Sequence, residues 1–150
     1  MKKINILILL ILSTLSLESI AADCEQVIES NDALQFNSKA MTVSAACETV
    51  TVTLKHTGQL PAKIMGHNWV LTKSSDFMAV AQAGGAAGPQ NNYVPQEDSR
   101  VIAYSKIIGG GESTTVTFST TDLSSSESYT FFCSFPGHYA IMQGSLTVID

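Results

Sequence analysis

The sequence is poor in positive charge, in cysteine and in histidine. Its 150 residues include 8 Lys and Arg against 13 Asp and Glu, which gives a formal net charge of -5. This acidic balance argues against binding to the phosphates of nucleic acids or to anionic membrane surfaces. Three cysteines are too few for a disulfide-dense scaffold, and three histidines exclude any site that needs many imidazoles.

Long hydrophobic runs are also scarce, and the clearest one lies at the N-terminus. Two lysines precede an apolar run at 6–12, and small residues follow it. This pattern is typical of a secretory signal peptide cleaved after Ala21, because the run is too short to span a bilayer. We therefore expect residues 1–21 to be the signal peptide, residues 22–150 to form one domain, and the protein to be periplasmic.

The three cysteines of an exported chain meet an oxidising compartment, where paired cysteines are usually bridged. Asp23 directly before Cys24 does not match a lipoprotein cleavage site, so no membrane anchor is expected. Three pairings are open, and the one between Cys24 and Cys47 is favoured if Cys133 has another use. Such a bridge would close a loop of roughly 20 residues and contribute about 3 kcal/mol to stability.

Alternation of apolar and polar residues dominates the remaining sequence and predicts an all-β domain. In residues 49–56 the even positions are apolar or His56, and the odd positions are Thr or Lys. Further short strands, separated by Gly and Pro turns, are expected at 68–72, 101–105, 113–119, 129–133 and 145–149. This spacing predicts an antiparallel β-sandwich. Residues 75–87, rich in Ala and Met, predict one short helix.

A thiol, an imidazole and a thioether come together in one short loop. Cys133 ends a strand, and His138 and Met142 follow before the next strand. Because the loops at one end of a sandwich converge, His67, at the entry of another strand, can approach this loop. Two His and one Cys in a plane with a long axial Met is the donor set of a blue-copper electron-transfer site.

A structural interpretation of these residues is a core Cys, a loop His and a packing Met. The spacing, the odd number of cysteines and the upstream His67 argue together against it. A free thiol in an oxidising compartment is a liability unless it is buried or bound to a metal. His67 alone would more often be structural, but its position between Gly66 and Asn68 favours the ligand.

On these residues the chain resembles the azurins, small bacterial blue-copper proteins of the cupredoxin fold. The Cys-x4-His-x3-Met spacing is suggestive, and together with Met-Gly-His-Asn-Trp at 65–69 it is highly specific. The resemblance covers nearly all of the mature chain. Its segments are 22–24, 31–32, 60–61, 65–69, 98–103, 131–133 and 135–138, followed by Met142.

The resemblance implies an eight-stranded Greek-key sandwich with an inserted helix, a Cys24–Cys47 disulfide and one type 1 copper per chain. The Nδ1 atoms of the two histidines and the Cys133 sulfur would bind copper. Met142 would be a distant axial ligand, and the Gly66 carbonyl would approach weakly from the other side.

The neighbours of these ligands also receive roles from the resemblance. Asn68 would fix the ligand loop, and the backbone N–H groups of Asn68 and Phe135 would hydrogen-bond the Cys133 sulfur and tune the potential. Trp69 would be a buried core aromatic.

A partner surface also follows from the resemblance. One edge of His138 would reach the surface within an apolar patch, which suits transient docking. The patch positions are Leu34, Leu60, Ile64, Met65, Phe135, Pro136, Ala140 and Ile141. The implied partners are c-type cytochromes and periplasmic reductases or dehydrogenases, and the chain is expected to be a monomer.

Several positions depart from the pattern of the family, Tyr139 and Gly85 among them, and one histidine stays outside the ligand set. Tyr139 stands where a small residue is usual, and Gly85 where a patch methionine is often found. These departures bear on the choice of partner rather than on copper. His56 points inward with its strand, so we favour a hydrogen-bonded core histidine over a redox modulator that responds to pH.

Other functions are less consistent with the sequence. A copper-delivery protein would be expected to have a Met-rich or Cys-x-x-Cys site, and neither is present. A multicopper enzyme needs further histidines, yet only His56 remains after His67 and His138, so no enzyme activity is expected. Zinc also takes Cys and His but has no use for a distant Met.

Overall fold

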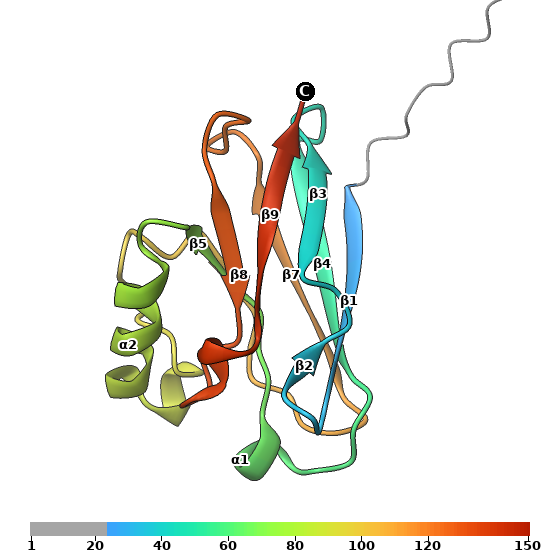
Figure 1. The fold of residues 1–150 in the computed structure, drawn as a ribbon, viewed down its shortest axis with the longest axis vertical. Helices are drawn as coiled ribbons and strands as arrows, with labels where there is room; N and C mark the ends of the chain where they lie inside the picture. The colour runs from blue at the N-terminus through green and yellow to red at the C-terminus, as the bar shows by residue number, and fades with distance from the viewer. Residues whose placement is uncertain (1–23) are drawn as a thin grey trace, which may run out of the picture.

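The computed structural model describes residues 24–150 (Figure 1). The predicted signal peptide, residues 1–21, lies outside the described residues. Among those that are described, no helix combines the length and apolar character needed to cross a membrane.

Two β-sheets face each other, as the alternation of apolar and polar residues predicted. The first sheet has the order β2-β1-β4-β7 and the second the order β3-β9-β8-β5-β6. The strands of the first sheet are β1 Glu25–Asn31, β2 Gln35–Phe36, β4 Thr49–His56 and β7 Ser113–Ser119. Those of the second are β3 Ala40–Ser44, β5 Val70–Lys73, β6 Ala103–Tyr104, β8 Tyr129–Phe132 and β9 Gln143–Ile149.

The sandwich is confirmed as a Greek-key fold of the cupredoxin type, but it is not wholly antiparallel. The pairs β1–β4 and β3–β9 are parallel, and the other pairs are antiparallel. The reason is the N-terminal segment, which leaves the first sheet after β2, enters the second as β3 and then returns as β4. The nine strands within residues 24–150 include β2 and β6, which have only two residues each.

The predicted helix is α2, Phe77–Ala87, which covers one edge of the second sheet (Figure 1). It buries Phe77, Val80, Ala81 and Gly84, the i, i+3, i+4, i+7 spacing of a single helix face. Two residues of the sheet, Val70 and Phe132, complete this small apolar cluster. The alternation did not predict the one-turn helix α1, Ala62–Met65.

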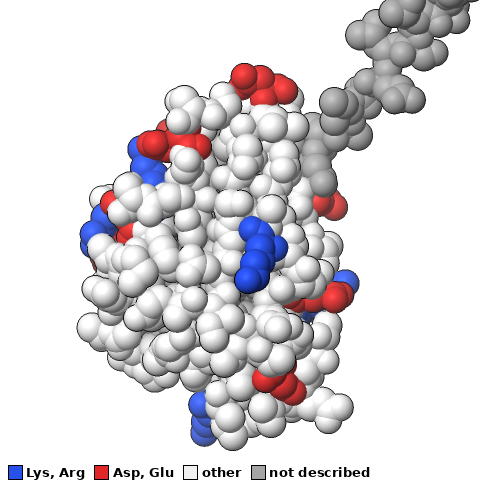
Figure 2. All heavy atoms as spheres, in the orientation of Figure 1, with Lys and Arg blue, Asp and Glu red and all other residues white. Residues whose placement is uncertain are grey.

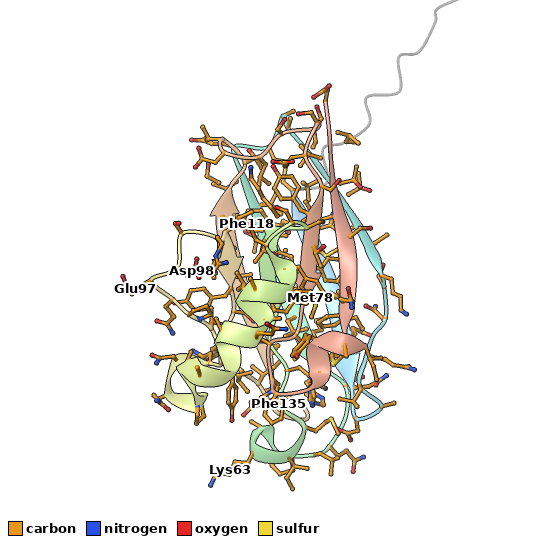
Figure 3. The ribbon with its side chains drawn as sticks, turned by 60° about the vertical axis from the view of Figure 1, so that its left-hand side comes forward. Lys63, Met78, Glu97, Asp98, Phe118 and Phe135 are labelled. Atoms are coloured by element: carbon orange, nitrogen blue, oxygen red, sulfur yellow. A yellow bond between two sulfur atoms is a disulfide. The ribbon has the colours of Figure 1, made fainter. Side chains whose placement is uncertain are left out.

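The main core lies between the sheets and is centred on aromatic rings. Trp69 has no exposed surface and stacks at ring-centroid distances of 5.8 Å on Phe118 and 6.0 Å on Phe131. Trp69 is therefore the core aromatic that the sequence predicted. In Figure 3, Phe118 lies inside the sandwich, away from the loops around Phe135.

Candidate metal centre

Three side chains from distant parts of the sequence meet at one end of the sandwich. The Cys133 sulfur lies 3.7 Å from the Nδ1 atoms of both His67 and His138, and these two nitrogens are 3.2 Å apart. All three residues are buried. They form a group of His and Cys donors able to hold a metal ion.

Backbone pairing fixes where each of these residues lies. His67 sits just before β5 and exchanges two backbone hydrogen bonds with Ile108, at 3.0 and 2.9 Å. Cys133 follows β8 directly, and its N–H donates to the Met142 carbonyl at 3.0 Å. The loop then turns at Gly137, whose φ of 83° is accessible to glycine at little cost, and His138 begins a short 3-10 helix, His138–Ala140.

The protonation of the two imidazoles bears on their use as ligands. The outer nitrogen of His67, Nε2, lies 2.9 Å from the Asn31 carbonyl, so Nε2 carries the hydrogen and Nδ1 is free to act as a ligand. Burial, with the nearby His56 and His138, lowers the pKa of His67 to about 4, against the opposing hydrogen bond to Asn31. Burial likewise lowers the pKa of His138 to about 4. Both rings are therefore neutral at neutral pH.

The Cys133 thiol is the only cysteine within residues 24–150 that forms no disulfide. Burial raises its pKa to about 12, and backbone hydrogen bonds from Asn68 and Phe135 oppose that rise. These are the two N–H groups that the resemblance assigned to the sulfur. A cation bound between the three donors would replace the thiol proton, since metal ions bind the thiolate.

The shape of the cluster fits a metal ion. For metal bonds of about 2.0 Å to nitrogen and 2.3 Å to sulfur, a planar trigonal site has edges of about 3.5 and 3.7 Å. The observed edges are 3.2 Å between nitrogens and 3.7 Å from each nitrogen to sulfur. Soft thiolate with imidazole suits copper, whereas Mg²⁺ and Ca²⁺ take oxygen ligands.

The backbones of the two residues predicted as weaker ligands lie next to the segments that carry this triangle. Met142 is 1 % exposed, and its backbone N–H donates to the His138 carbonyl at 2.8 Å. The Gly66 carbonyl oxygen is 3.9 Å from the Cys133 sulfur. Only glycine fits at position 66, because a Cβ there would lie 2.4 Å from the Ala62 carbonyl and 2.7 Å from the Ile107 side chain.

Asn68 joins the two ligand-bearing segments. Its side chain accepts from the Ser134 N–H at 2.8 Å and donates to the Ser134 hydroxyl at 2.8 Å. Asn68 follows His67 in the chain, and Ser134 follows Cys133. Ser134 and the Asn31 carbonyl were not predicted, because neither carries a recognisable motif and the fold alone brings them near the ligands.

The residues expected to form a partner patch differ in how far they are exposed. The large apolar side chains Ile64, Ile141 and Leu60 are 61, 55 and 37 % exposed. Pro136 and Ala140 are exposed, and Leu34, Met65 and Phe135 are half-buried. Figure 2 shows few charged side chains over the end of the sandwich that carries α1.

His56 is a hydrogen-bonded core histidine, as favoured from its strand position. It is 2 % exposed, its Nδ1 accepts from the Gly58 N–H at 3.1 Å, and its Nε2 donates to the Met65 carbonyl at 2.9 Å. Its ring stacks on His67 at 4.5 Å. Both nitrogens are occupied, so His56 is outside the ligand set.

Two of the departures from the azurin pattern have different surroundings. The Tyr139 ring packs edge-on against Phe77 of α2 at 6.4 Å, which links the ligand loop to the helix. Gly85 is exposed on α2, and a Cβ there would meet nothing within 4 Å. The surface of α2 at this position therefore has room for a side chain.

A cupredoxin sandwich with a His-Cys-His triangle at one end defines the class of blue copper proteins. The family model of copper-binding proteins of the plastocyanin/azurin type matches residues 22–149. The chain is 49 % identical over 140 residues to an azurin from Bordetella pertussis, and the match covers 93 % of both chains. It is 48 % identical over 138 residues to an azurin from Pseudomonas aeruginosa, and that match covers 92 % of this chain and 93 % of the relative. A solved azurin, Az-iso2 from the obligate methylotroph Methylomonas sp. strain J, superposes with a TM-score of 0.83 at 46 % identity, covering 86 % of this chain and all of that one.

This chain therefore belongs to the plastocyanin/azurin family of copper-binding proteins. Its cofactor is copper, and its function is that of a blue copper electron-transfer protein.

Proposed function

We propose that this protein is a soluble periplasmic carrier of single electrons, formed by residues 22–150 after removal of a signal peptide, 1–21. His67, Cys133 and His138 would hold one copper ion, with Met142 and the Gly66 carbonyl as distant ligands. Bound copper supplies one-electron chemistry between Cu(I) and Cu(II). The observation that carries the proposal is the buried triangle of two neutral imidazoles and one unpaired thiol.

The chain contributes a site that changes little when its charge changes. The Asn31 carbonyl fixes the ring of His67, and the Asn68 amide ties the segment of His67 to that of Cys133. Backbone N–H groups directed at the Cys133 sulfur stabilise its negative charge. Since these groups are set in place by the fold, gain or loss of an electron requires little movement of the protein.

Addition of Cu(II) to the purified mature protein tests the site. We expect an intense visible charge-transfer band that ascorbate bleaches and an oxidant restores. Cys133→Ser should lack the band, because the band requires the thiolate. The control is Cys47→Ser combined with Cys24→Ser, which leaves the donor triangle intact and should keep the band. A colourless copper complex of the unmodified protein would contradict the proposal.

Electron exchange would take place through the apolar patch around His138. A small apolar contact allows the rapid dissociation that an electron carrier needs. The proposed partners are c-type cytochromes as electron donors and periplasmic reductases or dehydrogenases as counterparts. The protein would dock with each of them as a monomer.

A pair of matched substitutions tests this surface. Ile64 and Val27 are 61 and 58 % exposed, but only Ile64 belongs to the patch. Ile64→Asp should slow electron exchange with a reduced c-type cytochrome in stopped-flow measurements, because a charge must be desolvated at the contact. Val27→Asp should leave the rate unchanged. Equal rates for both variants would place the contact elsewhere.

A further inference from the structure

Asn92 lies outside the ligand set, on a third segment that reaches the metal end. It follows α2 and a short 3-10 helix, Pro89–Asn91, and has a left-handed backbone with φ of 56°. Its N–H donates to the Pro89 carbonyl at 3.1 Å. Asparagine tolerates this conformation better than most residues. The turn directs the chain from the helix back towards the ligands.

The backbone carbonyl of Asn92 meets both ligand-bearing segments. It accepts from the Asn68 side-chain amide at 3.0 Å and from the Ser134 hydroxyl at 3.4 Å. Asn68 is adjacent in sequence to His67, and Ser134 is adjacent to Cys133. The Asn92 carbonyl is therefore hydrogen-bonded to the sequence neighbours of two predicted ligands.

The side chain of Asn92 holds a fourth segment. Its Oδ1 accepts from the Ile107 N–H at 2.9 Å. Ile108, the next residue, exchanges both backbone hydrogen bonds with His67. The Ile107 side chain also packs where a Cβ on Gly66 would lie. The Asn92 amide thus fixes the segment that positions the backbone of His67.

The turn around Asn92 is itself seated tightly. A Cβ on Gly84 of α2 would lie 2.3 Å from the Tyr93 carbonyl, so the helix and the turn are in close contact. The Tyr93 ring packs edge-on against Phe135 at 5.2 Å, and Phe135 contacts the His138 ring at 4.5 Å. Figure 3 shows Phe135 at the level between α2 and α1.

We propose that Asn92 is a positioning residue, whose side chain fixes the backbone of His67 through Ile107 without touching the metal. This inference rests on the copper site proposed above. Ligand geometry is maintained by groups that hydrogen-bond the ligands and their neighbours, so loss of one such anchor should alter the spectrum and the potential.

Two substitutions separate the side chain of Asn92 from its backbone. Asn92→Gly keeps the left-handed turn and the carbonyl but removes the acceptor for the Ile107 N–H. Asn92→Asp keeps an oxygen acceptor and is the conservative rescue. The control is Asn91→Gly, because the Asn91 side-chain amide donates to the Ala87 carbonyl at the end of α2, at 2.9 Å, and not to a segment that carries a ligand.

In the metal-free protein we expect the Ile107 amide of Asn92→Gly to exchange about fivefold faster, the factor for loss of one ordinary hydrogen bond. The ring signals of His67 should shift in its NMR spectrum. In the copper-loaded protein, the visible band and the copper hyperfine coupling should shift with Asn92→Gly, return with Asn92→Asp, and stay unchanged with Asn91→Gly. The midpoint potential should shift with Asn92→Gly and stay unchanged with Asn91→Gly.

Asn92→Gly with unchanged His67 signals, band and potential would overturn the inference, even if the variant were less stable. A wild-type protein that forms no charge-transfer band would instead overturn the proposed function. In that case the His67 signals of the metal-free protein still decide the role of Asn92, since they are measured without copper.

Discussion

The two ends of the sandwich contain cysteine in different chemical states. Cys24, just before β1, is bonded to Cys47, just before β4, at a Cα–Cα distance of 5.6 Å. At the other end, Cys133 is unpaired, buried and beside two histidines. The same residue type closes a covalent loop at one end and supplies a metal donor at the other.

The neighbours of each sulfur explain the difference. At the disulfide end the partner is a second cysteine, and the bridge acts on the unfolded chain by limiting its conformations. At the metal end burial keeps the thiol protonated until a cation arrives, and the surrounding groups are polar and hydrogen-bonded. Stability at that end is therefore expected to depend on metal and on pH.

The largest effect should come from copper itself. At free copper a thousandfold above its dissociation constant, binding to the folded state adds about 4 kcal/mol to the free energy of unfolding. The gain should be the same in the wild type and in Cys24→Ala/Cys47→Ala, because effects at distant sites add. Denaturant titrations with and without copper measure both gains, and unequal gains would show that the two ends are coupled.

Removal of the disulfide should act on stability alone. The bridge joins residues 23 apart in sequence, so Cys24→Ala/Cys47→Ala is expected to cost about 3 kcal/mol. The visible band of the copper-loaded variant should keep its position. A shifted band would mean that the bridge also shapes the metal end.

The metal-free protein should lose stability as pH falls. In the folded protein the pKa values of His67 and His138 are about 4, below the ordinary value of 6.5. Between pH 4 and pH 6.5 the unfolded chain therefore binds more protons than the folded protein. The contribution of these two histidines to the free energy of unfolding is complete above pH 6.5. It declines as the pH falls towards 4 and changes little below pH 4. Denaturant midpoints across this range should fall less steeply in His138→Gln, and parallel curves would contradict the assignment.

Gly66→Ala tests the close packing of the metal end. The new Cβ would lie 2.4 Å from the Ala62 carbonyl oxygen, so the backbone must shift. We expect this shift to lower the free energy of unfolding by about 1–3 kcal/mol. Because Gly66 precedes His67, the visible band should shift too. Thermal unfolding and absorption spectra measure the two effects. A variant with unchanged stability and an unchanged band would show that Gly66 and the Ala62 carbonyl are not tightly packed.

Gly85→Ala is the matched substitution at a glycine with open space around it, and it has the smallest expected effect. A Cβ at Gly85 is free of contacts, and alanine favours the helix interior over glycine by about 0.5–1 kcal/mol. The variant should therefore be slightly more stable, with an unchanged band. A loss of stability would indicate that α2 needs the flexibility of glycine.

The sequence by itself determined the all-β class, the helix of 75–87 and the residues of the donor set. Alternation reports which face of a strand is buried, and the sequence has only three cysteines and three histidines from which a donor set could come. The parallel pairs β1–β4 and β3–β9 were not readable, because alternation is the same in parallel and antiparallel strands.

Only the tertiary structure decided how the donors are held. Asn31, Ser134 and Asn92 contribute carbonyl, hydroxyl and amide groups that carry no sequence signature, and they act because distant segments converge at one end of the sandwich. A motif specifies which atoms can bind a metal, whereas their spacing and protonation depend on burial and on hydrogen bonds across the fold. Those contacts exist only once the two sheets have packed.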